Sequence, residues 1–75
     1  MIPLGRYQHF KGGLYQVTQL ARDSENEEWQ VVYYPLYGNI ESNGQPEYWV
    51  RALRMFDETI ERDGKTFKRF TYVGQ

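Results

Sequence analysis

The stretch Trp29-Gln30-Val31-Val32-Tyr33-Tyr34-Pro35-Leu36-Tyr37 decides the fold of this 75-residue chain. It is nearly continuous in β-branched and aromatic residues, which favour strands. Side chains alternate between the two faces of a strand, and here both faces are apolar. Such a strand is either central and covered twice or curled within a barrel. In so small a protein we expect a bent barrel strand that leaves its pairing at Pro35, which cannot donate a ladder hydrogen bond.

The segments around this stretch also read as strands and turns. Residues 1–7 are expected to form an extended lead-in, followed by a turn at Gly12-Gly13. Residues 14–21 alternate as a strand does, with a bulge or strand end expected near Leu20. The acidic residues 22–28 are predicted to connect two strands, and residues 38–47 to form a long irregular loop.

Residues 48–56, Tyr-Trp-Val-Arg-Ala-Leu-Arg-Met-Phe, fit two structures. Val50, Leu53 and Phe56 have helical spacing, whereas the flanking residues favour strands. We expect a short strand followed by at most one helical turn near residues 52–55, with a long helix as the alternative. The dipeptide Asp63-Gly64 then predicts a tight hairpin, in which Glu58 faces Arg69.

These elements together predict a mostly β fold. We expect residues 1–75 to form one domain, a small SH3-like barrel of about five strands. Large aromatic residues should stabilise its small core, because they make up 17% of the chain. The expected core residues are Val17, Trp29, Val31, Tyr33, Val50, Leu53, Phe56, Ile60 and Phe70.

Composition limits the possible functions. The formal net charge is −1, so no global positive field attracts nucleic acid or an anionic membrane. The sequence contains no cysteine and no apolar run of the ~20 residues needed to span a bilayer. It begins without the apolar region of a secretory signal. We therefore expect a cytoplasmic protein that has no membrane partner.

Four motifs resemble those of a known family. They are Tyr7-Gln8-His9-Phe10-Lys11-Gly12-Gly13-Leu14-Tyr15-Gln16-Val17, Val31-Val32-Tyr33-Tyr34-Pro35-Leu36-Tyr37-Gly38, Trp49-Val50-Arg51-Ala52-Leu53-Arg54-Met55-Phe56 and Arg69-Phe70. In order and spacing, the chain resembles the bacterial domain-of-unknown-function family numbered 1653. The resemblance implies a small barrel-like bacterial domain without an established activity.

The residues available for catalysis form no complete set. His9 is the only histidine, and both serines lie in polar loops, so no nucleophile and base are paired by the sequence. One histidine and scattered carboxylates also give no metal-ligand spacing. We therefore expect neither a metal nor a cofactor, and an enzyme centred on His9 is the least favoured hypothesis.

The leading hypothesis is a non-catalytic binding module. Its groove would be rimmed by His9, Tyr34, Tyr37, Trp49 and Arg51 and would hold a peptide or a small anionic ligand. Arginine suits this role because its guanidinium group binds carboxylate or phosphate in a bidentate manner. The alternative is a single-stranded nucleic-acid binder, which the net charge disfavours. An exposed strand edge leaves either a monomer or a weak homodimer open.

Overall fold

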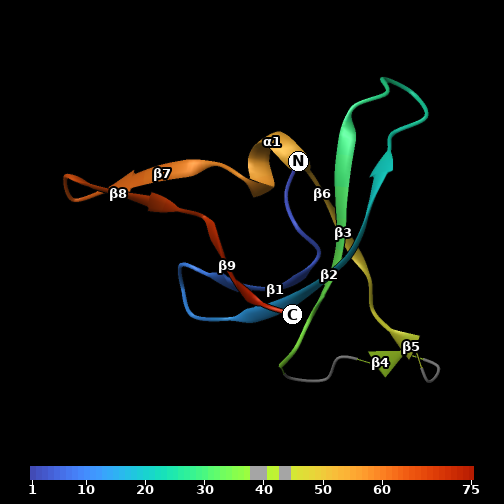
Figure 1. Cartoon of the computed structure of the whole chain (residues 1–75), viewed down its shortest axis with the longest axis horizontal. Coiled ribbons are helices and arrows are strands. Elements are labelled where there is room, and N and C mark those ends of the chain that lie inside the picture. Colours follow the sequence, from blue (N-terminus) through green and yellow to red (C-terminus); the bar gives the residue numbers. More distant parts are fainter. Residues whose placement is uncertain (38–40, 43–44) are drawn as a thin grey trace.

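Five antiparallel strands form the main sheet of the computed structural model, which describes residues 1–37, 41–42 and 45–75 (Figure 1). The spatial order of these strands is β6-β3-β2-β1-β9. In chain order they are β1 (Gly5–His9), β2 (Leu14–Arg22), β3 (Trp29–Pro35), β6 (Trp49–Ala52) and β9 (Phe70–Gly74). The predicted mostly β fold is therefore confirmed.

The sheet curls but remains open. Its edge strands, β6 and β9, pair with β3 and β1 and do not pair with each other in the described part of the chain (Figure 1). A closed SH3-like barrel is therefore not confirmed. The predicted strand around Trp29 lies second from one edge, and its pairing ends at Pro35 as expected.

A bulge in β2 keeps the apolar side chains of that strand on one face. Val17 pairs with Tyr33 and Leu20 pairs with Val31, so the four residues 17–20 of β2 match the three residues 31–33 of β3. The register shift lies between Val17 and Gln19, slightly earlier than the bulge predicted near Leu20. The extra residue brings Leu20 back to the face that Tyr15 and Val17 share, and it bends the strand.

The core lies on the inner face of the curled sheet, beneath a single helical turn, α1 (Leu53–Phe56). Phe56 of this turn stacks on Phe70 of β9, with ring centroids 4.0 Å apart. The buried hydrophobic residues of the described chain are Tyr7, Tyr15, Val17, Val31, Tyr33, Phe56, Ile60 and Phe70.

The core prediction holds for most of its residues. Six of the nine expected residues are buried, and Leu53 packs half-buried against them. Trp29 is also only half-buried, and the guanidinium carbon of Arg22 lies 4.5 Å from its ring centroid. Val50 was wrongly assigned to the core: it pairs with Val32 on the outer face and is 65% exposed. Tyr7 and Tyr15 were missed.

The ambiguous stretch 48–56 forms a strand followed by one helical turn, as expected, and the long helix is wrong. The turn ends where the Asp57 N–H donates to the Leu53 carbonyl oxygen over 2.9 Å. One turn suffices to bring Leu53 and Phe56 against the core. Val50 shares their helical spacing but lies on the opposite face of the sheet.

A separate hairpin projects from the sheet (Figure 1). It pairs β7 (Thr59–Arg62) with β8 (Lys65–Lys68), in the predicted register of Ile60 opposite Phe67. Asp63 and Gly64 both have positive φ, of 54° and 78°, as this tight turn requires. The hairpin extends the molecule to 43 × 32 × 20 Å. At Arg69 the chain leaves the hairpin and then joins the main sheet as β9.

Two predictions for irregular segments need correction. Residues 5–7, expected to belong to an extended lead-in, form β1 together with residues 8–9 and lie between β2 and β9. Within the predicted loop 38–47, β4 (Glu41–Ser42) pairs with β5 (Gln45–Pro46). Gly38-Asn39 and Asn43-Gly44, which were predicted to form turns, lie outside the described residues.

The helix content bears on membrane insertion. The helix α1 has four residues. No helix among the described residues is long and apolar enough to cross a membrane.

Candidate ligand-binding surface

Four of the five predicted site residues gather on the inner face of the sheet. Trp49 pairs with Tyr33, Arg51 pairs with Val31, and His9 pairs with Phe70, so all three share a face with the core. Tyr37 follows β3 and reaches the same group through Tyr15. We call this group the aromatic–arginine cluster; it comprises His9, Tyr15, Tyr33, Tyr37, Trp49, Arg51 and Phe70.

Tyr15 occupies the centre of the cluster. Its ring centroid lies 5.5–5.6 Å from those of Tyr33, Tyr37 and Phe70, in edge-to-face geometry. His9 and Trp49 lie farther out, with centroids 6.5 and 6.3 Å from Tyr15. Trp49 is 42% exposed and Tyr37 is 52% exposed, so the buried rings form a floor and these two form an accessible rim.

Tyr15 and Tyr37 are joined through their hydroxyl groups. The two oxygens lie 2.7 Å apart in a hydrogen bond. Burial and this hydrogen bond raise the pKa of Tyr15 to about 12. The Tyr15 hydroxyl therefore stays protonated at neutral pH, and the bond anchors Tyr37 to the floor of the cluster.

Arg51 is held among rings without a carboxylate partner. Its Nε–H donates to the Tyr33 hydroxyl over 3.4 Å, and its guanidinium carbon lies 5.7 Å from the Phe70 ring centroid. No carboxylate of the described residues lies within ion-pair distance of it. Arg54, three residues further along, instead forms an ion pair with Glu28. Two arginines that lie three residues apart in the sequence therefore have different surroundings in the structure: Arg54 is paired with a carboxylate, and Arg51 lies among aromatic rings.

His9 lies in a positively charged environment. Burial lowers the pKa of His9, and the nearby Arg69, Arg51 and Lys11 lower it further. Its Nδ1 accepts the backbone N–H of Lys11 over 3.1 Å, which leaves the proton of the neutral ring on Nε2. These contacts fix the turn after β1, and no hydrogen bond joins His9 to a side-chain nucleophile in the described residues. The same cations create a local positive potential that suits an anion.

Tyr34 is not brought together with the other four residues. It pairs with Gln16 on the outer face of the sheet, and its ring lies 5.4 Å from that of Tyr48. Alternation along β3 separates it from Tyr33. Tyr34 therefore cannot line the same surface as Trp49 and Arg51.

Two cavities of the described residues lie away from the cluster. One, of about 260 Å³, is lined by Glu28, Trp29, Leu53 and Arg54. Another, of about 300 Å³, is lined by Thr18, Gln19, Val32 and Tyr48 on the opposite face. We place more weight on the cluster, because it combines an arginine without a carboxylate partner, hydroxyl groups and exposed rings.

The sequence did not identify the floor of this surface. Tyr33 was assigned to the core, and Tyr15 was predicted only to lie in the strand 14–21, so neither was expected beside Arg51. The pairing of neighbouring strands is needed to align Tyr15 with Tyr33 and Trp49. Among the side chains described, His, Asp and Glu form no group of three that could hold a metal ion.

The fold and this surface define a small, curled β domain that presents an arginine on an aromatic floor. The family described as "Protein of unknown function (DUF1653)" matches residues 5–72, and the chain belongs to this family. It is similar to the crystal structure of a DUF1653 protein from Bordetella bronchiseptica, with 38% identity and a TM-score of 0.81. The match covers 97% of this chain and 88% of that one. No curated protein matches the chain.

Proposed function

We propose that the protein is a non-catalytic binding module whose aromatic–arginine cluster holds a small anionic ligand or an acidic group of a peptide. The observation that supports this proposal is the half-buried Arg51, which lies among aromatic rings without a carboxylate partner in the described residues. A buried cation is costly unless it is paired, so an anion that reaches Arg51 gains more than it would at an exposed lysine.

The geometry of Arg51 favours bidentate recognition. Its Nε–H is directed to the Tyr33 hydroxyl. Both terminal amino groups then remain for a ligand, and their fixed spacing matches two oxygens of a carboxylate or phosphate. The contact with Tyr33 also reduces the side-chain entropy lost on binding, because the guanidinium group is already oriented.

The rim of the cluster favours a ligand that carries a planar or apolar part. Trp49 and Tyr37 are 42% and 52% exposed, and both rings lie next to Tyr15. Exposed aromatic rings of this kind bind flat groups by stacking. A mononucleotide and a peptide with an aromatic and an acidic residue both combine the two features.

A chemical-shift screen by NMR tests the proposal. We expect phosphate, adenosine monophosphate and an acidic tyrosine-containing peptide to shift the Trp49 indole and Arg51 Nε signals. The substitution Arg51→Gln should abolish the response, because it removes the charge and the fork of donors. Arg54→Gln is the matched control, since Arg54 already pairs with Glu28. Equal loss in both variants, or shifts confined to the cavity beside Trp29, would contradict the proposal.

A further inference from the structure

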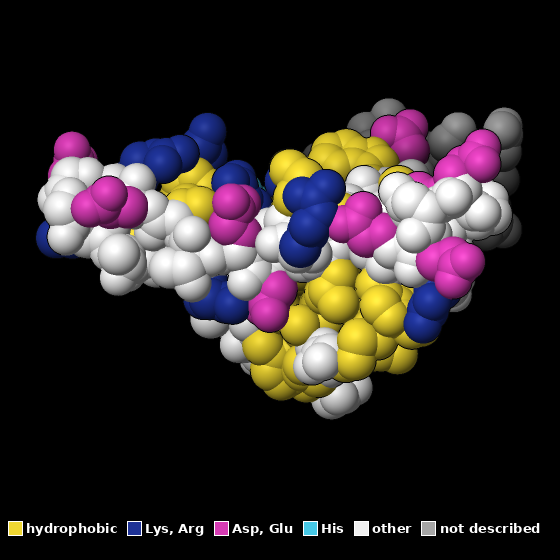
Figure 2. Space-filling model, turned by 90° about the horizontal axis from the view of Figure 1, so that it is seen from above, with side chains coloured by type: hydrophobic (Ala, Val, Ile, Leu, Met, Phe, Trp, Pro, Cys, Tyr) yellow, Lys and Arg dark blue, Asp and Glu magenta, His cyan; other side chains and the backbone are white. Residues whose placement is uncertain are grey.

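The projecting hairpin has one basic and aromatic face. Alternation and the register of β7 with β8 place Arg62, Lys65, Phe67 and Arg69 on the same side. At this end of the molecule, Figure 2 shows lysine and arginine side chains beside hydrophobic ones, with Asp and Glu side chains next to them. We call these four residues, together with Phe10 and Lys11, the hairpin face.

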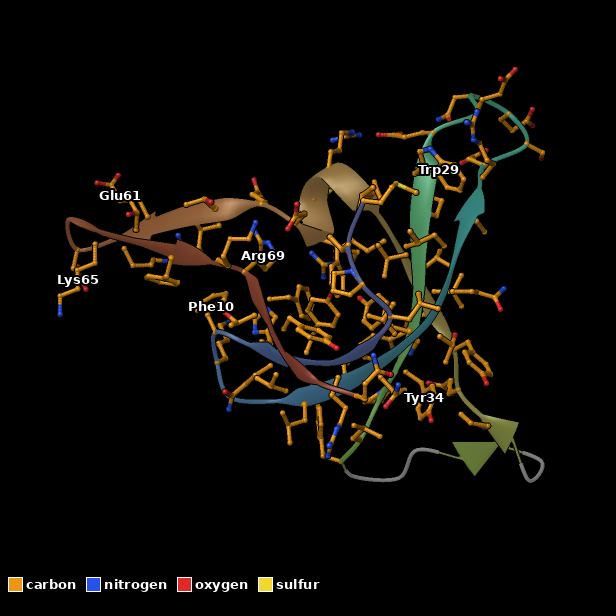
Figure 3. All side chains as sticks on the ribbon, in the orientation of Figure 1. Phe10, Trp29, Tyr34, Glu61, Lys65 and Arg69 are labelled. Carbon is orange, nitrogen blue, oxygen red and sulfur yellow. The ribbon has the colours of Figure 1, made fainter. Side chains whose placement is uncertain are left out.

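Phe10 connects the hairpin to the main sheet. Its ring centroid lies 5.5 Å from that of Phe67, and its backbone N–H donates to the Arg69 carbonyl oxygen over 3.0 Å. Figure 3 shows Phe10 at the turn after β1, close to Arg69 at the base of the hairpin. On the other side, the Phe10 ring lies 4.5 Å from that of His9. The hairpin face is therefore continuous with the aromatic–arginine cluster.

Cations surround Phe10. The Lys11 ammonium and the Arg62 guanidinium carbon lie 5.8 and 5.7 Å from its ring centroid. Interaction with the ring holds both charges beside Phe10. The carboxylate of this face, Glu58, is engaged by Arg69 over 2.9 Å.

The cations without carboxylate partners are unevenly distributed. In the described part of the chain, Arg22, Arg54, Lys68 and Arg69 form ion pairs. The remaining lysines and arginines of the structure are Arg6, Lys11, Arg51, Arg62 and Lys65. All of them except Arg6 belong to the hairpin face or to the cluster. The strand neighbour of Arg6 is Gln16, and its guanidinium group donates to the Gln75 carbonyl oxygen.

We propose that this combined surface binds single-stranded nucleic acid. Backbone phosphates would follow Lys65, Arg62 and Lys11, and bases would stack on Trp49 and Tyr37 at the other end. A local row of cations with adjacent aromatic rings binds single strands with little sequence preference. Glu28, Asp57 and Glu58 are neutralised in ion pairs, so the net charge of −1 does not describe the local field of this surface. The carboxylates next to it are Glu47, which accepts the Trp49 Nε1–H over 3.4 Å, and Asp63 in the hairpin turn. Exposed stacking rings favour nucleic acid over an acidic peptide.

This inference deepens the proposed function and rests on it for the nucleotide that contacts Arg51. The cations of the hairpin face offer phosphate contacts that a mononucleotide is too short to reach. An oligonucleotide should therefore bind more tightly than a mononucleotide. A duplex should bind more weakly than a single strand, because its bases are not free to stack.

Fluorescence anisotropy with a labelled oligothymidylate of about twelve nucleotides tests the inference. The triple variant Lys11→Gln, Arg62→Gln, Lys65→Gln should bind about tenfold or more weakly at low salt, and the salt slope should fall by about two. Adenosine monophosphate should still shift the Trp49 signal in this variant. Arg6→Gln, which removes a cation of the outer face, is the control and should bind as wild type.

The outcomes separate the two proposals. A mononucleotide that binds at Arg51, together with an oligonucleotide that binds no tighter, overturns the inference and leaves the proposed function intact. Oligonucleotide binding that depends on the hairpin cations but is unchanged by Arg51→Gln contradicts the proposed function alone. Equal loss in Arg6→Gln, equal binding of duplex, or full competition by polyglutamate overturns the inference.

Discussion

Gly5 occupies a position that no other residue can take without strain. Its φ is 135°, and a Cβ there would lie 2.8 Å from the Gly74 carbonyl oxygen and 3.0 Å from the Tyr72 ring. The main sheet can therefore bring β9 against β1 only because Gly5 has no side chain. Gly5 was expected to lie in an extended lead-in, and nothing local in the sequence showed this close approach.

The substitution Gly5→Ala should lower the free energy of unfolding by about 2 kcal/mol or more, since it combines a strained backbone with a backbone clash. Gly12→Ala is the matched control. Gly12 also has positive φ, of 105°, but a Cβ there would meet nothing within 4 Å, so we expect a loss of only about 1 kcal/mol. Urea denaturation measures both. Equal losses would show that the approach to Gly74 is unimportant.

His9 should make stability depend on pH. Because its pKa in the folded protein is lowered below 6.5, the unfolded chain takes up a proton first as the pH falls. The stabilising effect is complete above pH 6.5 and is lost as the pH falls through the lowered pKa of the folded state. The difference in unfolding free energy between wild type and His9→Asn should therefore shrink in acid. Parallel pH profiles for the two proteins would contradict this expectation.

The residue scale also shows where sequence patterns fail. Val50 was placed in the core because of its helical spacing with Leu53 and Phe56, but it lies on the outer face of β6. Tyr7 and Tyr15 are buried, although tyrosine hydroxyls usually seek water. Each finds a hydrogen-bond partner, Pro3 for Tyr7 and Tyr37 for Tyr15. Such partners depend on strand pairing, which the sequence does not specify.

Elements with local turn chemistry were the most predictable. Asp63-Gly64 fixed the register of the β7–β8 hairpin and placed Glu58 opposite Arg69, and the structure confirms both. The helical turn was predicted within one residue of α1. By contrast, β1 carries few β-branched residues and takes its pairing from β2 and β9, so its sequence alone did not reveal a strand.

The ion pair of Glu58 with Arg69 should tie the base of the hairpin to the sheet. Both Nε and Nη2 of Arg69 donate to one Glu58 oxygen, and the Arg69 backbone N–H donates to the Glu58 carbonyl oxygen. A double-mutant cycle with alanine should give a coupling of about 0.5–1 kcal/mol. In the alanine variants, amide hydrogen exchange should be faster than in wild type for residues 59–68 and unchanged for β2 and β3.

The exposed pair of Arg22 and Glu27, at 3.8 Å, serves as the control for this cycle. We expect a coupling near zero there, because both side chains are solvated. A coupling of similar size in the two cycles would indicate a general charge effect rather than a tie at the base of the hairpin.

At the scale of the molecule, stability depends on a few large rings. Phe56 is fully buried against Phe70, Tyr7 and Tyr33. The substitution Phe56→Ala should therefore cost about 3–5 kcal/mol, a large part of the total expected for a domain of this size. Val50→Ala should change the unfolding free energy by less than about 0.5 kcal/mol. Chemical denaturation separates the two, and similar losses would contradict the assignment of Val50 to the surface.

The sequence predicted the mostly β fold class, but it did not show that the sheet remains open. Strand propensity and turn dipeptides are local, and they indicated a mostly β chain of about five strands. Whether the edge strands meet depends on strand order, twist and the bulge in β2, which are properties of the assembled sheet. The strand order also explains why four predicted site residues converged, whereas Tyr34 lies on the other face because side chains alternate along β3.

The pairing of β1 with β9 has a consequence for how the protein folds. Arg6 lies opposite Gly74, so this ladder joins positions separated by nearly the whole chain. The neighbouring strands β1, β2 and β3 can pair as soon as residue 35 has left the ribosome. Phe70, which completes the core, is synthesised well after these three strands. Native contact order is therefore high, and we expect the final docking of β9 to limit the folding rate and to occur after translation of the domain.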